Sequence, residues 1–244
     1  MRAMVLAAGL GTRLRPLTND RPKALVEVCG RPMLEIALLR LRKFGIHDVI
    51  VNAHHFADML VEYLHRHDSF GMNIEVSRED VLLDTGGGLK KAAHFFSDSG
   101  EPFLLHNVDV LSNIDLSALM QAHQEQNALA TLAVQDRTGS RRLLFDPNAE
   151  LCGRRTRGAA DEVVRSAQKM TPLAFSGIHV ISPRIFALLN EEGPFSIVDA
   201  YLRLAGEGEK IVAFCADQYY WRDLGTLDRL HAAEEDVQRG SIHI

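Results

Sequence analysis

The residues best suited to chemistry lie in the first two dozen positions, where glycines and cations follow an apolar segment. Residues 3–8 carry no charge and are typical of a buried strand in a parallel sheet. Gly9 and Gly11 come next, and glycines there let the backbone turn and present its N–H groups to an anion. Arg13 and Lys23 add positive charge close by in the sequence. This spacing predicts a loop that binds phosphate groups.

Two common phosphate-binding glycine motifs do not fit this segment. A Walker A loop needs Gly-Lys-Ser/Thr at a fixed distance after the first glycine, and the sequence lacks it. The dinucleotide-binding motif needs a third glycine at position 14, where the chain has Leu14.

The segment from Leu6 to Lys23 resembles instead the signature of the sugar-1-phosphate nucleotidylyltransferases, L-A-A-G-x-G-T-R-x-x-P-L-T followed by P-K. The resemblance implies that the loop wraps a nucleoside triphosphate (NTP). It also implies that Arg13 holds the departing pyrophosphate and that Lys23 contacts phosphate oxygens at the reacting centre. The residues expected around the triphosphate are Ala8, Gly9, Gly11, Thr12 and Arg13.

Two aspartates are candidates for holding a divalent cation, which offsets the repulsion between anionic oxygens when one phosphate attacks another. Asp109 follows an apolar strand expected at residues 102–105, at the edge of the sheet where ligands bind in α/β folds. Asp223 lies in the segment 221–226, which resembles the family's W-x-D-x-G-T element, whose aspartate shares the metal. We therefore expect Asp109 and Asp223 to bind Mg²⁺, with Mn²⁺ as an alternative. Val108 stands where the family commonly has glycine, which restricts the backbone and adds bulk beside Asp109.

Two further glycine elements resemble the family. Residues 84–88 match its E-T-G-G-G element with Asp84 in place of Glu, and Gly86 and Gly87 are expected to let the backbone approach the nucleotide base. Gly177, in Phe-Ser-Gly-Ile, is expected to leave room for the sugar, although a plain core strand explains it equally well. The family's E-K-P sugar-binding element is missing between residues 134 and 175.

Composition indicates one α/β domain of 244 residues, with 46% hydrophobic residues to form its core. Alternating strand and helix patterns predict a mainly parallel central sheet covered on both faces. The family resemblance implies that this is a Rossmann-like nucleotidyltransferase fold. We expect residues 1–134 to bind the NTP and residues 135–244 to bind the sugar phosphate. The expected helices span residues 32–44, 56–65, 84–96, 115–126, 182–189 and 227–238. The expected strands span residues 3–8, 48–52, 72–76, 102–105, 129–134, 173–181 and 210–214.

Charge and cysteine content narrow the class of partner. A formal charge of −5 argues against a nucleic-acid-binding protein, which needs a broad basic face. Three widely spaced cysteines suggest neither a disulfide framework nor a zinc site, and with no apolar stretch of membrane-spanning length they favour a cytoplasmic enzyme. The sequence leaves the oligomeric state open.

The segment 135–169 departs from the strand–helix rhythm and is polar and rich in arginine, which predicts a hairpin and a loop. One interpretation is a solvated, mobile loop. The other is that some of its arginines, Arg154 and Arg155 in particular, close over an anionic sugar phosphate in place of the missing E-K-P lysine. Farther along the chain, the spacing of Ser196 and Asp199 predicts a capping box at the start of a helix.

The expected reaction joins an NTP and a sugar 1-phosphate into an NDP-sugar and pyrophosphate, by direct attack of the sugar phosphate and without a general base. The chain looks most like short N-acetylmuramate-1-phosphate uridylyltransferases and mannose-1-phosphate guanylyltransferases. A cytidylyltransferase for phosphocholine is one alternative, since Tyr219, Tyr220 and Trp221 cluster, although they flank the metal element. A non-catalytic nucleotide-sugar sensor is the other, against which the intact Arg13 and Lys23 argue.

Overall fold

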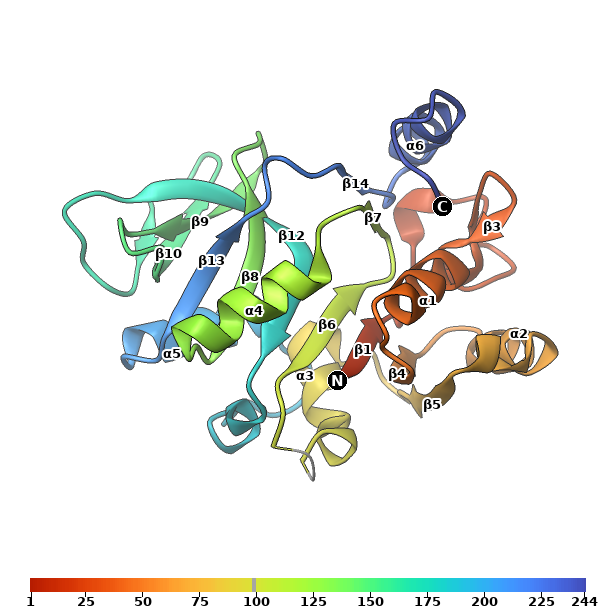
Figure 1. Cartoon of the computed structure of the whole chain (residues 1–244), viewed down its shortest axis with the longest axis horizontal. Coiled ribbons are helices and arrows are strands. Elements are labelled where there is room, and N and C mark those ends of the chain that lie inside the picture. Colours follow the sequence, from red (N-terminus) through yellow and green to blue (C-terminus); the bar gives the residue numbers. More distant parts are fainter. Residues whose placement is uncertain (98–99) are drawn as a thin grey trace.

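The computed structural model describes residues 1–97 and 100–244, in which ten strands form one twisted sheet (Figure 1). Its order is β11-β10-β9-β12-β6-β1-β4-β5, and β8 pairs with β12 and β13. The strands of this sheet are β1 (Arg2–Leu6), β4 (Asp48–Ala53), β5 (Asn73–Arg78), β6 (Phe103–Asn107), β8 (Ala130–Gln135), β9 (Arg141–Phe145), β10 (Leu151–Thr156), β11 (Glu162–Val163), β12 (Thr171–Ile181) and β13 (Ile211–Cys215).

The two halves of the sheet differ in strand direction. Strands β6, β1, β4 and β5 are parallel, and β13 is parallel to β8. Strand β12 runs antiparallel to β6, β8 and β9, and the hairpin β9–β10 continues with β11 in antiparallel pairs. The predicted α/β fold is therefore confirmed, with parallel strands from β6 to β5, and β12 makes the whole sheet mixed.

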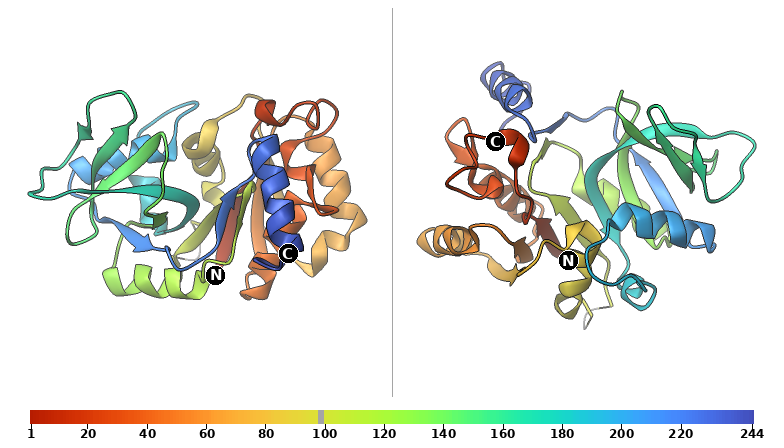
Figure 2. Two further views of the ribbon diagram at one scale, coloured as in Figure 1. Left: turned by 90° about the horizontal axis from the view of Figure 1, so that it is seen from above. Right: turned by 180° about the vertical axis from the view of Figure 1, so that it is seen from behind.

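Six α-helices of the described residues surround the sheet: α1 (Met33–Lys43), α2 (Ala57–Arg66), α3 (Asp84–Lys91), α4 (Leu116–Gln126), α5 (Ile197–Gly206) and α6 (Leu227–Gln238). Helices α1 and α4 lie in front of the sheet in Figure 1, whereas α3 and α5 cover the other face, which the right view of Figure 2 shows. Side chains of β1 alternate between the two cores: Ala3 and Val5 belong to the core with α1 and α2, and Met4 to the core with α3 and α5. None of the described helices has the length and apolar character needed to cross a bilayer.

Several helix boundaries follow from local chemistry. Pro32 precedes α1, and the Asp115 side chain accepts hydrogen bonds from the backbone N–H groups of Ser117 and Ala118 at the start of α4. Ser196 caps α5 as predicted, since its Oγ accepts from Val198 N at 3.2 Å. The partner expected to complete the capping box, Asp199, instead accepts from Arg154 Nη1 at 2.7 Å.

Two predicted helices are shorter than expected. The helix predicted at residues 182–189 is a 3₁₀ helix over Pro183–Ala187. The helix predicted to reach residue 96 ends at Lys91 and is followed by a separate 3₁₀ turn over Ala93–Phe95. Both departures lie away from the candidate catalytic residues.

Candidate active site

Of the two glycines in the loop after β1, Gly11 has a geometry that requires glycine, whereas Gly9 has neither a positive φ nor an atom near its Cβ position. Gly11 adopts φ +64°, and a Cβ atom there would lie only 2.9 Å from Thr18 Cγ2 and 3.0 Å from Lys23 Cβ. Thr18 Oγ1 donates to the carbonyl of Gly11 at 2.9 Å. Arg13 follows in a 3₁₀ turn over Thr12–Leu14, and Lys23 begins another over Lys23–Leu25. Gly11 is thus required by a close approach as well as by its φ angle.

A buried asparagine that the sequence reading did not single out supports this loop. Asn52 Oδ1 accepts hydrogen bonds from the N–H groups of Ala7 at 2.6 Å and Ala8 at 3.3 Å. Its Nδ2 donates to Glu79 Oε1 at 2.7 Å, and Glu79 Oε2 accepts from Leu83 N at 3.0 Å. This network joins the start of the phosphate loop to the segment that leads into α3. A lone polar residue near the end of the apolar strand β4 was the available signal.

The two predicted metal-binding aspartates are brought together by a small antiparallel sheet, β7 (Val110–Ser112) with β14 (Trp221–Asp223). Asp223 pairs with Val110 in this register, and Leu224 N donates to the carbonyl of Asp109 at 2.8 Å. Residues more than a hundred positions apart in the chain therefore become neighbours. Lys23 Nζ forms an ion pair with Asp109 Oδ2 and so joins the same cluster.

The surroundings of Gly225 show how closely the predicted catalytic residues approach one another. A Cβ atom on Gly225 would lie 2.8 Å from Asp223 Oδ1 and 3.0 Å from Arg13 Nη2. The same position is 3.5 Å from Asp109 Oδ2. A guanidinium and two carboxylates therefore surround one small volume, which the absent side chain of Gly225 leaves open.

Asp223 is ionised at neutral pH in this setting. Its partial burial raises the pKa, but the hydrogen bond from Gly225 N at 2.7 Å and the nearby cations outweigh burial and hold the pKa below its usual value. Arg229 Nη1 is the closest of these cations, 2.9 Å from Asp223 Oδ1, and Lys23 adds a weaker attraction. An anionic Asp223 is the form that could hold a metal.

Two cavities meet at Asp109. The first, of about 420 Å³, is lined by Leu6, Ala8, Gly9, Lys23, Asn52, Leu82, Asp84, Thr85, Asn107, Val108, Asp109 and Pro194. The second, of about 620 Å³, has Arg13, Asn107, Asp109, Gly177 and Asp223 among its lining residues. Because Asn107 and Asp109 line both cavities, two ligands could approach each other there.

Comparison with known proteins agrees with this geometry. The nucleotidyl transferase family matches residues 2–142, more than half of the chain. The chain belongs to this family. It is 36% identical to the N-acetylmuramate alpha-1-phosphate uridylyltransferase of Caulobacter vibrioides, with 95% of each chain covered. It is 27% identical to the mannose-1-phosphate guanyltransferase of Yarrowia lipolytica, over 92% of this chain and 61% of that protein.

The fold of this nucleotidyl transferase is also found among solved structures. It matches a UDP-glucose pyrophosphorylase in complex with UDP-glucose with a TM-score of 0.78 at 17% sequence identity, covering 98% of both chains. The family and the class of enzyme predicted from the sequence are thereby confirmed.

The departure from the family pattern at Val108 fits the backbone. Val108 is 4% exposed, its N–H donates to the carbonyl of Leu6 at 3.1 Å, and its φ lies outside the left-handed region. A glycine is therefore not needed at this position to bring Asp109 to Leu224.

The glycines of α3 pack closely against neighbouring segments of the nucleotidyl transferase, and their expected approach to a nucleotide base stays a prediction. The N–H groups of Gly86 and Gly87 both donate to the carbonyl of Phe195, at 2.9 and 3.3 Å. A Cβ atom on Gly86 would lie 2.2 Å from Phe195 Cε2, and one on Gly88 would lie 2.8 Å from Asn52 Nδ2. Their neighbours Asp84 and Thr85 reach the first cavity instead. Thr85 Oγ1 also accepts from Ile197 N at 3.0 Å.

Gly177 lies on the wall of the second cavity, and its expected role in leaving room for a sugar stays a prediction. It adopts φ +72°, within a register irregularity between Phe175 and His179 of β12. A Cβ atom there would lie 2.7 Å from Asn107 Nδ2. Glycine is thus needed for the close contact between β12 and the end of β6.

The donor set at Asp109 and Asp223 suits a hard divalent cation, since such ions take carboxylate oxygens together with phosphates and water. One oxygen of each aspartate lies within 3.5 Å of the point beside Gly225. Elsewhere in the described residues, no group of three or more His, Cys, Asp or Glu side chains could hold a metal. Because the protein would supply only two carboxylates, most coordination positions of the cation would be filled by phosphate oxygens and water.

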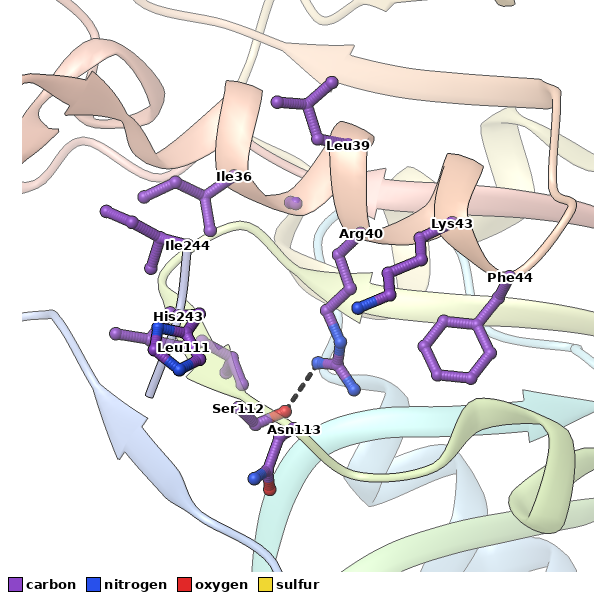
Figure 3. Close-up of a pocket in the computed structure, with 12 residues that line it drawn as sticks. Ile36, Leu39, Arg40, Lys43, Phe44, Leu111, Ser112, Asn113, His243 and Ile244 are labelled. Atoms are coloured by element: carbon purple, nitrogen blue, oxygen red, sulfur yellow. Dashed lines mark hydrogen bonds between the residues drawn. The ribbon is translucent and has the colours of Figure 1, made fainter. Parts of the chain in front are cut away.

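Arg40, a partly buried arginine of α1, supports strand β7, which directly follows Asp109 in the chain. Arg40 of α1 donates to Ser112 Oγ at 2.6 Å and to the carbonyl of Ile114 (Figure 3). Burial lowers the pKa of Arg40 to about 10, against the opposing attraction of Asp115. Arg40 lines a separate cavity of about 360 Å³ between α1, β7 and the chain's last residues, His243 and Ile244. The contact fixes β7, and with it the pairing that brings Asp223 to Asp109.

The predicted hairpin in the arginine-rich segment is confirmed as β9–β10, and two of its arginines, Arg154 and Arg155, are paired with carboxylates. Arg154 binds Glu162 and Asp199, both at 2.7 Å. Arg155 binds Asp161 at 2.7 Å. These ion pairs favour an ordered hairpin over the mobile loop of the sequence prediction.

Proposed function

We propose that this chain transfers the uridylyl group of UTP to N-acetylmuramate 1-phosphate and releases pyrophosphate. The observation that carries the proposal is the meeting of the two cavities at Asp109, with Arg13, Lys23 and Asp223 around the same point. Such an arrangement suits a reaction in which two phosphate-bearing substrates approach from opposite sides.

The two halves of the chain would divide the substrates. The nucleotide would lie in the first cavity, whose lining residues all precede residue 110 except Pro194. The sugar phosphate would lie in the second cavity, where β12 and β14 supply Gly177 and Asp223. Residues 1–134 would thus bind chiefly the nucleotide, and residues 135–244 chiefly the sugar phosphate.

Charge neutralisation would supply most of the catalysis. Arg13 is placed to hold the pyrophosphate as negative charge develops on it, and Lys23 can exchange Asp109 for a phosphate oxygen. Asp109 and Asp223 would hold Mg²⁺, or Mn²⁺ in its place, which when bound neutralises phosphate charge and orients the reacting groups. The sugar phosphate is already ionised at neutral pH, so the attack requires no general base.

Overall similarity favours uridylyl over guanylyl transfer. The uridylyltransferase matches over 95% of its own length at 36% identity, whereas the chain covers 61% of the guanyltransferase at 27% identity. We also propose a cytoplasmic location, since the three cysteines, Cys29, Cys152 and Cys215, are free thiols in the structure.

A pyrophosphate-release assay tests the proposal by crossing the four common NTPs with a panel of acceptors. The panel contains N-acetylmuramate, N-acetylglucosamine, mannose and glucose 1-phosphates, and phosphocholine. We expect the highest kcat/KM for UTP with N-acetylmuramate 1-phosphate. A higher value for GTP with mannose 1-phosphate, or for CTP with phosphocholine, would overturn the assignment. Turnover with no pair would favour a nucleotide-sugar sensor.

A further inference from the structure

The second cavity contains an arginine that the reaction as described does not use. Arg137 follows β8, and its guanidinium carbon lies 3.5 Å from the centroid of the Trp221 ring. Arg137 Nη2 donates to the carbonyl of Phe175 at 2.6 Å. Trp221 Nε1 donates to the carbonyl of Ser176 at 2.7 Å. Both members of this stack are therefore fixed to adjacent residues of β12, directly before Gly177.

Arg137 retains hydrogen-bonding capacity in this position. A guanidinium has five N–H donors, and the bond to Phe175 uses one of them. The Nε atom is buried and has no hydrogen-bond partner within the described residues. Burial lowers the pKa of Arg137 to about 10, so it remains a cation at neutral pH. A buried cationic donor without a partner is costly, and an anionic ligand would remove that cost.

The other charges of the second cavity leave Arg137 without a direct ion pair, and only the more distant charge of Asp223 attracts it. Asp109 is paired with Lys23, and Asp223 is paired with Arg229. Throughout residues 1–97 and 100–244, no carboxylate lies within ion-pair distance of Arg137. The cavity wall carries five arginines and two aspartates, namely Arg13, Arg137, Arg141, Arg222, Arg229, Asp109 and Asp223. This excess of positive charge suits an anionic occupant.

We propose that Arg137, held in place by Trp221, binds an oxyanion of the acceptor substrate, either its phosphate or a carboxylate on its sugar. The inference rests on the proposed function, because it assigns the second cavity to the acceptor. The stack fixes the guanidinium plane before the substrate arrives, so less side-chain entropy is lost on binding. Arg137 would supply the charge for which the sequence offers no E-K-P lysine, a role that Arg154 and Arg155 cannot take while they are paired with carboxylates.

Steady-state kinetics of Arg137→Ala and Arg137→Lys test this role, with UTP and each of two acceptors, N-acetylmuramate and N-acetylglucosamine 1-phosphate. We expect Arg137→Ala to raise the KM for the acceptor about tenfold or more, because a charge-assisted contact is lost. The KM for UTP should stay within about twofold of the wild-type value, and Arg137→Lys should restore part of the acceptor affinity. Arg142→Ala, a matched change in strand β9, is the control and should leave both KM values unchanged.

The two acceptors distinguish the source of the oxyanion. A rise in KM for both would assign Arg137 to the shared phosphate, and a rise confined to N-acetylmuramate 1-phosphate would assign it to the carboxylate. An unchanged acceptor KM in Arg137→Ala would overturn the inference alone, as would equal rises for UTP and acceptor that Arg137→Lys does not reverse. If Arg137→Ala fails to fold, Arg137→Gln takes its place, and an unchanged acceptor KM in that variant overturns the inference. An inactive wild-type protein would overturn the proposed function as well.

Discussion

The phosphate loop and the arginine-rich hairpin both present cations, but they differ in where the counter-ions come from. Lys23 pairs with Asp109, which lies 86 residues later and beyond three strands of the main sheet. Arg155 pairs with Asp161, 6 residues away, and Arg154 pairs with Glu162, 8 residues away, and also with Asp199 of α5. The pairs of Arg154 and Arg155 hold the hairpin to its neighbouring segments, whereas Lys23 and Asp109 both line the first cavity.

The aspartate pair should give the largest effect in testing this contrast. Asp109→Asn and Asp223→Asn should each lower kcat about a hundredfold or more while the proteins remain folded, because the loss of a metal ligand weakens charge neutralisation in the transition state. Turnover measured with Mg²⁺, with Mn²⁺ and with excess chelator checks this expectation, alongside circular dichroism of each variant. Full activity in excess chelator would contradict it.

Arg13 should give the next largest effect. Arg13→Ala should lower kcat about a hundredfold and change the KM for UTP less, because the guanidinium meets charge that develops on the pyrophosphate as the bond breaks. Arg15→Ala, in the same exposed turn, is the matched control and should keep nearly full turnover. A defect confined to the KM for UTP would instead assign Arg13 to binding of the ground state.

The hairpin arginines should give a small kinetic effect. In the double variant Arg154→Ala, Arg155→Ala, the KM for the sugar phosphate should change by less than about twofold, because both guanidinium groups already bind carboxylates near the surface. Measuring both KM values beside those of Arg137→Ala compares the hairpin with the cavity directly. A tenfold rise in the sugar-phosphate KM would place these arginines over the substrate and remove the contrast.

Three buried histidines, His106, His123 and His179, should make the free energy of unfolding depend on pH. Burial lowers the pKa of His106 and His179 to about 3 and that of His123 to about 4, against 6.5 for an ordinary histidine. At a pH between its folded-state pKa and 6.5, each of these histidines is protonated in the unfolded chain but neutral in the folded chain. The free energy of unfolding should therefore be highest above pH 6.5 and fall on acidification, by up to about 1.4 kcal/mol per pH unit for each group.

Urea denaturation at several pH values between 7.5 and 5 measures this slope. His123→Gln, which replaces the imidazole that contacts Thr131 Oγ1 at 3.0 Å, should make the slope shallower than in wild type. Equal slopes would show that His123 titrates alike in the folded and unfolded chains.

The phosphate loop was predictable because its chemistry depends on neighbours in the sequence. Gly9, Gly11, Arg13 and Lys23 lie within fifteen positions, and strand β1 before them has the expected apolar run. The meeting of Asp109 with Asp223 followed only from the family resemblance, since no local pattern links residues so far apart. The support from Asn52 and Glu79 was missed because a single polar residue in a strand does not specify its partner.

Local sequence patterns could not predict the direction of the strands or the pairing of charged side chains. An apolar strand such as β12 has the same alternation whether its neighbours run parallel or antiparallel, so its antiparallel pairing depends on the tertiary fold. The packing of the α3 glycines could not be predicted, because Phe195, which leaves no room for a side chain at Gly86, comes more than a hundred residues later. The acids that neutralise Arg154 and Arg155 were visible in the sequence, but their pairing required the hairpin register.

The position of β12 also has a consequence for how the chain is made. This strand contacts β6, β8 and β9, yet it spans Thr171–Ile181 and so leaves the ribosome after more than two thirds of the chain. Until then β6 and β8 lack their shared neighbour and present unpaired backbone edges, the kind of surface that aggregates. Translation that pauses before residue 171 should thus prolong a vulnerable interval, and truncated chains that end there should depend on chaperones.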